Sequence, residues 1–97
     1  MMIKHVVMWR FKEENKKENM AHTKEMLLAL PAIIPEIKKM EVYFDTLHGE
    51  MSYDLMLESE FESMEALNSY IVNPEHKKVS AFVRSVIETR VSLDAEI

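Results

Sequence analysis

The 97-residue sequence contains no cysteine, which excludes disulfide frameworks, thiolate metal sites and cysteine nucleophiles. Its only glycine is Gly49, so neither a glycine-rich phosphate loop nor a dinucleotide-binding fingerprint can form. No apolar run approaches the roughly 20 residues of a membrane span, and no secretory signal is expected at the amino terminus. Only 12 Lys and Arg stand against 17 Asp and Glu, giving a net charge of −5, so nucleic acid and membrane partners are not expected.

The residues that are present are those of a folded chain. With 47% hydrophobic and 30% charged residues, the composition is typical of a globular domain and not of a disordered segment. We expect residues 1–97 to form one domain, and the absence of cysteine is compatible with a cytoplasmic location. A chain of this size buries only about 60 to 65% of its unfolded surface, so association with a second copy would add to its stability.

Apolar periodicity predicts an alternation of strands and helices. Strands are expected over residues 3–12, 40–45, 53–58 and 89–93. A first helix is entered through the charged residues 13–19 and ends at Pro31 and Pro35. Ser63 is the expected N-cap of a second helix, and Asn73 followed by Pro74 marks a fresh helix start.

The order β-α-β-β-α-β predicts an α+β fold of the ferredoxin-like type, with an antiparallel sheet covered by helices on one face. The first strand is apolar on both faces, because Val6 and Met8 alternate with the His5 face. Together with Tyr43 and Met56, these residues would expose an apolar patch on the uncovered face. We therefore expect a homodimer that packs through this face of the sheet.

Three residues are candidates for acid/base chemistry. His5 shares a strand face with Val7 and Trp9, where a buried imidazole needs a hydrogen-bond partner, so a structural core histidine is the alternative interpretation. His76 follows the Asn-Pro helix start, and a helix N-terminus disfavours imidazolium, so a neutral base is expected. Tyr70 could donate a hydrogen bond to a carbonyl oxygen that develops negative charge, or it could simply be a packed helix residue.

The remaining candidates favour ordinary structural roles. His22 is expected to be solvated on the first helix, and His48 is expected to be a turn residue beside Gly49. A metal site would need two histidines together with carboxylates. The available carboxylates alternate along the third strand and its exit, as on a solvated edge. These carboxylates are Glu58, Glu60 and Glu62.

The strand Lys4–Lys12, the turn Ile33-Ile34-Pro35, the helix entry Phe61-Glu62-Ser63 and the segment Tyr70–His76 resemble the stress-responsive dimeric α/β-barrel (Dabb) family. The resemblance runs nearly from end to end. It implies a ferredoxin-like monomer whose sheet pairs with a second sheet to form a dimeric α/β barrel. Many members have no assigned reaction, whereas polyketide cyclases of the family close a linear poly-β-keto thioester by aldol condensation.

The cyclase pattern matches His5, Tyr70 and His76 in this sequence. By this resemblance His76 would abstract an α-proton, Tyr70 would stabilise the enolate or alkoxide, and His5 would orient the substrate or hold the Tyr70 hydroxyl. Val7 and Trp9 would line the substrate pocket, with the Trp9 indole standing where smaller aliphatic residues are usual.

No cofactor is needed for this chemistry, although some relatives hold Mg²⁺ on main-chain oxygens near the turn after the first helix. The corresponding positions here are Pro31, Ile34 and Ile37.

Three functions therefore remain open. The first is a homodimer with a His/Tyr pocket that binds or acts on a small hydrophobic carbonyl compound. The second is a non-enzymatic stress-response or ligand-binding dimer. The third is a cofactor-free monooxygenase or a haem-handling enzyme on the related dimeric barrel, with His76 as a candidate axial ligand.

Overall fold

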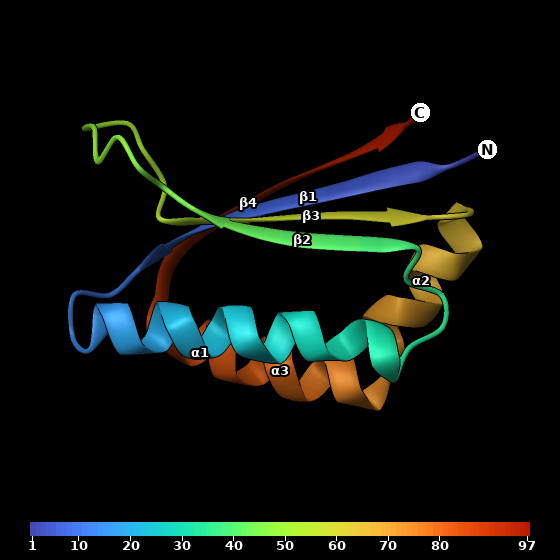
Figure 1. The fold of residues 1–97 in the computed structure, drawn as a ribbon, viewed down its shortest axis with the longest axis horizontal. Coiled ribbons are helices and arrows are strands. Elements are labelled where there is room, and N and C mark those ends of the chain that lie inside the picture. Colours follow the sequence, from blue (N-terminus) through green and yellow to red (C-terminus); the bar gives the residue numbers. More distant parts are fainter.

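The computed structural model describes all of residues 1–97 as one sheet with helices on one of its faces (Figure 1). The strands are β1 (Ile3–Phe11), β2 (Lys39–Phe44), β3 (Leu55–Phe61) and β4 (Ile87–Glu96). The helices are α1 (Lys16–Ala29), α2 (Met64–Val72) and α3 (Pro74–Val86), and a 3₁₀ turn (Leu30–Ala32) follows α1. This order confirms the predicted ferredoxin-like β-α-β-β-α-β arrangement, with the second helical region divided in two.

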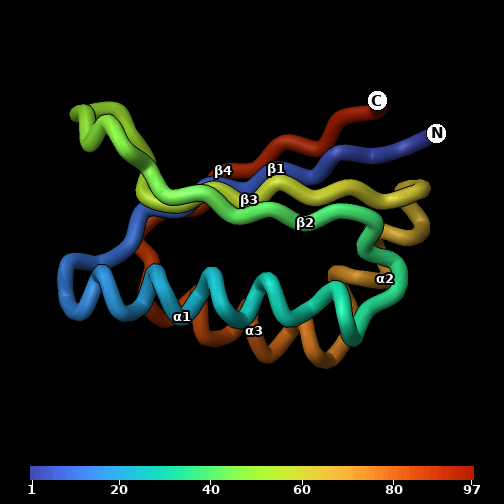
Figure 2. Tube along the Cα trace, in the orientation of Figure 1, coloured from blue at the N-terminus to red at the C-terminus, as the bar shows by residue number.

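The four strands are antiparallel and lie in the order β2-β3-β1-β4. Figure 2 shows the N-terminal and C-terminal strands running side by side, although they come from opposite ends of the chain. His5 on β1 lies opposite Ser59 on β3 and opposite Asp94 on β4. The expectation that Glu58 and Glu60 line a sheet edge is wrong, because β3 is an inner strand and both residues lie on the open face of the sheet.

The core lies between the sheet and the helices. Alternate residues of β1 point into it and are buried, with His5 as the only polar side chain among them. Leu27 and Leu30 from the α1 region, Leu67 from α2, and Val79 and Val83 from α3 close the core from the helical side.

The opposite face of the sheet carries apolar side chains that reach solvent. Met8 is 36% exposed, Tyr43 46% and Leu93 68%. Towards one end, this face carries ion pairs that link Lys4 to Glu58 and Glu60. The apolar part is therefore a patch bordered by charges and not an evenly polar surface, which is the form of surface expected at an interface.

Helices α2 and α3 both begin with the N-cap residues that the sequence predicts. The Ser63 hydroxyl accepts a hydrogen bond from the Ala66 N–H at 3.1 Å at the start of α2. The Asn73 side-chain oxygen accepts one from the Glu75 N–H at 2.9 Å, and Pro74 occupies the first position of α3. These contacts set the direction in which the first turn of α3 presents its side chains.

The end of α1 before Pro31 agrees with the prediction, whereas the bounds of the last strand differ from the predicted ones. Helix α1 ends at Ala29, because Pro31 cannot continue the α-helical hydrogen bonds and the chain tightens into a 3₁₀ turn. Strand β4 is longer than expected, starting at Ile87 and reaching Glu96, since it pairs along the whole of β1.

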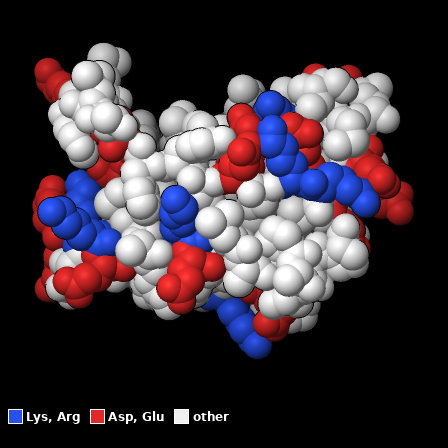
Figure 3. Space-filling view, viewed as in Figure 1, with Lys and Arg blue, Asp and Glu red and all other residues white.

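The charged residues are interspersed over the surface seen in Figure 3, where Lys and Arg side chains lie beside Asp and Glu and do not form a continuous basic stripe. None of the helices combines the length and the apolar composition needed to cross a lipid bilayer.

Candidate functional site

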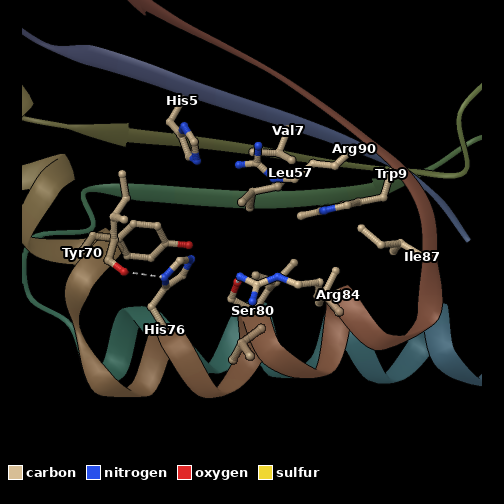
Figure 4. Close-up of a pocket in the computed structure, with 14 residues that line it drawn as sticks. His5, Val7, Trp9, Leu57, Tyr70, His76, Ser80, Arg84, Ile87 and Arg90 are labelled. Carbon is tan, nitrogen blue, oxygen red and sulfur yellow. Dashed lines mark hydrogen bonds between the residues drawn. The ribbon is translucent and has the colours of Figure 1, made fainter.

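A pocket of about 340 Å³ opens between the inner face of the sheet and helix α3 (Figure 4). Fourteen residues line it, and nine of them are hydrophobic. The three predicted residues His5, Tyr70 and His76 lie together at one end of this pocket. The size lies at the lower end of the range for small-molecule sites, and the mostly apolar wall with a few polar groups is typical of such sites.

Tyr70, near the end of α2, is fully buried, and its hydroxyl has no hydrogen-bond partner in the protein. Its ring packs against the Phe61 ring, with the centroids 5.0 Å apart, and against the His76 ring at 4.2 Å. Burial raises the pKa of Tyr70 far above its ordinary value, so the phenol keeps its proton at neutral pH. The hydroxyl is therefore a buried donor that has no partner within the chain.

His76 stands in the first turn of α3, facing the pocket. Its Nδ1 lies 3.1 Å from the Ile71 carbonyl, which can only accept, so Nδ1 is the donor. The neutral ring then carries its free lone pair on Nε2.

The pKa of His76 is lowered, mainly by burial and further by the charges of His5 and Arg90. The direction is the predicted one, but burial is the largest cause.

His5 is 6% exposed and its Nδ1 forms a very short contact with the carboxylate of Asp94 on β4. Because an ionised carboxylate only accepts, Nδ1 donates and the ring orientation is fixed by Asp94. The two residues are opposite one another in the β1–β4 register. The alternative role expected for His5, that of holding the Tyr70 hydroxyl, is wrong, since that hydroxyl has no partner.

Asp94 was not predicted from the sequence. Alternation along the last strand places Arg90, Ser92 and Asp94 on one face, and this pattern could have been used. It becomes informative only when the last strand is known to pair with β1 in a defined register.

The predicted pocket residues Val7 and Trp9 both line the cavity and are almost completely buried. Two arginines also line it, Arg84 from α3 and Arg90 from β4, and neither was predicted. Nothing in the sequence alone distinguishes them from solvated charges on an amphipathic helix and an edge strand.

The other histidines lie outside this pocket. His22 is exposed on α1, as predicted, and its ring packs edge-on against Phe82 with the centroids 4.8 Å apart. His48 is exposed in the connection between β2 and β3, and its φ of 57° is left-handed, as suits a turn position.

Metal ligands are not assembled by the side chains. No group of three or more His, Asp or Glu residues is placed to hold an ion. In the turn after α1, the side chains of Pro31, Ile34 and Ile37 are apolar, and the Ile34 carbonyl accepts the Ile37 N–H at 3.2 Å. Mg²⁺ needs a near-octahedral set of oxygens, usually with carboxylates among them, so these residues do not by themselves make a magnesium site.

The arrangement is suited to proton transfer at a carbon next to a carbonyl group. It combines a neutral imidazole with a free Nε2, a protonated phenol without a partner, and a second imidazole held by a carboxylate. His5 and Tyr70 are buried, which strengthens their electrostatic effects, whereas His76 is half-buried.

Comparisons with known proteins agree with this architecture. Olivetolic acid cyclase from Cannabis sativa is 29% identical over 98 residues, covering 97% of this chain and 95% of the cyclase. A dimeric protein with a ferredoxin-like fold from Bacteroides fragilis superposes with a TM-score of 0.91 at 32% identity, covering 99% and 96% of the two chains.

A hydroxynitrile lyase from Passiflora edulis shares the fold with a TM-score of 0.89 at 19% identity, covering 99% of this chain and 93% of the lyase. Residues 3–97 match the stress responsive A/B barrel domain. The chain therefore belongs to the stress responsive A/B barrel domain family.

Proposed function

We propose that this protein binds a small hydrophobic carbonyl compound in the pocket beneath the sheet and catalyses proton transfer at its α-carbon without a cofactor. The observation that carries this proposal is the Tyr70 hydroxyl, which is fully buried, protonated and without a partner at the end of an apolar pocket. A buried donor left unpaired costs free energy, and a ligand carbonyl oxygen would restore the missing hydrogen bond.

In the proposed reaction, the substrate carbonyl accepts a hydrogen bond from Tyr70. Nε2 of His76 takes the α-proton, the C–H electron pair forms the carbon–carbon double bond, and the carbonyl electrons move onto oxygen. The Tyr70 hydroxyl stabilises this enolate oxygen. Attack of the enolate carbon on a second carbonyl of the same substrate then forms a carbon–carbon bond, and the His76 imidazolium returns its proton to the new alkoxide.

The proposed role of the His5–Asp94 pair is to orient the substrate. Asp94 fixes the His5 ring on the wall opposite His76, so that His5 contacts the substrate from the sheet side. This division of roles agrees with the cyclisation implied by the name of the Cannabis relative, which is 29% identical to this chain.

The proposal can be tested without knowing the natural substrate. Exchange of the α-hydrogens of 2-heptanone in D₂O, followed by ¹H NMR, measures enolisation directly. We expect catalysed exchange with the wild type, and a loss of about 10² to 10⁴ in rate for His76→Ala, the usual contribution of a general base. His22→Ala is the matched control, since His22 is exposed outside the pocket, and it keeps the wild-type rate.

The outcomes separate an enzyme from a ligand-binding protein. Exchange that is absent in the wild type, or equal in the wild type and His76→Ala, would overturn the catalytic proposal. If 2-heptanone still binds in that case, the non-enzymatic ligand-binding dimer becomes the better description. A pocket of about 340 Å³ favours such small ligands over a macrocycle such as haem.

The protein is also proposed to act as a homodimer that joins the open faces of two sheets. Solved relatives with this fold are described as dimeric. The apolar part of the open face, with Met8, Tyr43 and Leu93, supplies the surface that a second copy would cover.

A further inference from the structure

The two arginines of the pocket have no carboxylate partner. The Arg84 guanidinium contacts the Ser80 hydroxyl at 3.4 Å, and the Arg90 guanidinium contacts the Ser92 hydroxyl at 3.5 Å. Both are long, weak contacts, and no Asp or Glu oxygen lies within 4.0 Å of either guanidinium group.

Both arginines are exposed to solvent, and they lack a carboxylate partner although the chain is acidic. Seventeen Asp and Glu residues are available, and several lysines are paired with them, among them Lys4, Lys16 and Lys39. Asp94 shares a strand face with Arg90, but its carboxylate pairs with His5. The pocket therefore holds two positive charges that its own carboxylates leave unneutralised.

The two side chains approach the pocket from opposite walls. In Figure 4 the Arg90 side chain extends along the sheet side toward His5, and the Arg84 side chain runs along α3 toward Ser80. The charge of Arg90 partly opposes the rise that burial causes in the pKa of Tyr70, and it adds to the lowering of the pKa of His76, so it acts on the two groups of the proposed chemistry. The cavity that both side chains line is mostly apolar.

We propose that Arg84 and Arg90 together bind a carboxylate of the ligand, so that the substrate class is hydrophobic oxo acids and not neutral carbonyl compounds. This inference rests on the proposed function, because it assigns the substrate of the same pocket. Guanidinium groups match a carboxylate with paired, charge-assisted hydrogen bonds, and Arg84 and Arg90 line the pocket with side chains that are exposed to solvent and free to pair. The ketone end of such an acid would lie toward Tyr70 and His76.

Trp9 provides the measurement, since it is the only tryptophan and it lines the pocket. We would titrate the protein with 6-oxoheptanoate and with its uncharged analogue 6-oxoheptanamide, following Trp9 fluorescence. The expected result is that the acid binds at least about tenfold more tightly than the amide, and that added salt weakens this preference.

The variants Arg84→Gln and Arg90→Gln should each reduce the ratio of the affinity for the acid to the affinity for the amide. Lys17→Gln is the matched control, because it removes the same charge from an exposed position outside the pocket and should leave the preference unchanged. Circular dichroism of each variant checks that its fold is intact.

Equal binding of acid and amide by the wild type would overturn the inference and leave the proposed function standing. A preference for the acid that survives both arginine substitutions would overturn it as well, and so would inorganic phosphate that competes more tightly than the acid. Failure of the proposed function would appear separately, as absent α-hydrogen exchange of the uncharged 2-heptanone.

Discussion

The Tyr70 hydroxyl is expected to lower the stability of the fold while raising the rate of the proposed reaction. It is buried without a partner, so the folded protein carries the desolvation penalty of an unmade hydrogen bond. Tyr70→Phe removes the hydroxyl and keeps the ring packing against Phe61. We expect this variant to be as stable as the wild type, or more stable by about 1 kcal/mol, in urea unfolding. Its α-hydrogen exchange rate should fall by about 10² to 10³.

Phe61→Leu serves as the comparison for Tyr70→Phe, because it disturbs the same aromatic cluster without touching a polar atom. It should lose about 1 kcal/mol or more of stability. If Tyr70→Phe were instead clearly less stable than the wild type, the hydroxyl would have a structural partner, and its role as the donor for a substrate carbonyl would be refuted.

His76 predicts how stability depends on pH. Burial lowers its folded pKa below the ordinary value of about 6.5, so on acidification the unfolded chain binds a proton before the folded one does. The free energy of unfolding should therefore fall between about pH 6.5 and the lowered pKa, and should be unaffected by His76 above about pH 7.5. Urea unfolding of the wild type and His76→Gln at about pH 8 and pH 5 measures this difference.

In this comparison His76→Gln should lose less stability on acidification than the wild type. His22→Gln, an exposed histidine on α1, should behave as the wild type does. The acid limb of the exchange rate should have its midpoint below pH 6.5 for the same reason. An acid limb at or above that value would contradict the assignment of the half-buried His76 as the base.

The residues of the candidate site differ in how well they could be predicted from the sequence. His5 stands out because an imidazole on an otherwise apolar strand face needs a partner, and His76 stands out because of the Asn-Pro start before it. Asp94 and the two pocket arginines do not, since charged residues on an edge strand or a helix are usually solvated. The positions of Asp94 and Arg90 come from the register of β4 on β1, and that of Arg84 comes from the packing of α3 beneath the sheet; local patterns specify neither.

Among the elements, the start of α3 matters most for the site, because it positions His76. Asn73 caps this helix and thereby sets the direction of its first turn, which presents His76. Asn73→Ala should lower the stability by about 0.5 to 2 kcal/mol, the usual loss of an N-cap. It should also reduce the exchange rate, because the His76 ring loses its fixed position.

Ser63→Ala gives the matched control for this cap, since Ser63 caps α2 with a hydrogen bond of similar length. Urea unfolding should show a similar loss of stability for Ser63→Ala, and the exchange assay should show the wild-type rate. Equal loss of activity in both variants would mean that the caps act through general stability and not through the placement of His76.

Element boundaries were predictable where a residue itself blocks or starts a structure. Pro31, Ser63 and the Asn73-Pro74 pair mark their elements correctly, because they change the backbone hydrogen bonds directly. The ends of β3 and β4 were not predictable to the residue. Their lengths depend on how far β1 extends beside them, which is a tertiary property.

At the scale of the whole molecule, the open face of the sheet predicts association. Met8 lies on this face near the centre of the sheet, so Met8→Lys would place a charge in a sheet-to-sheet interface. Sedimentation of the wild type at micromolar concentration should show a dimer, and Met8→Lys should weaken dimerisation by at least about tenfold. Leu47→Lys is the control, since Leu47 is 81% exposed in the loop between β2 and β3, and it should remain dimeric.

A wild type that sediments as a stable monomer would remove the dimer proposal. The sequence predicted the exposed apolar face because Val6 and Met8 alternate with a buried set on the same strand. It could not predict how much of each side chain remains exposed, which depends on the neighbouring strands.

The pairing of β1 with β4 also affects how the chain folds during its synthesis. It brings together His5 and Asp94, which are 89 residues apart in the chain. Closing this loop, the longest in the fold, costs the chain conformational entropy. Such distant strand pairing slows folding. During synthesis, a nascent chain that has not yet released β4 already contains His5, Tyr70 and His76, but it lacks both Arg90 and Asp94. The proposed ligand pocket is therefore completed only when the last strand has been synthesised and paired.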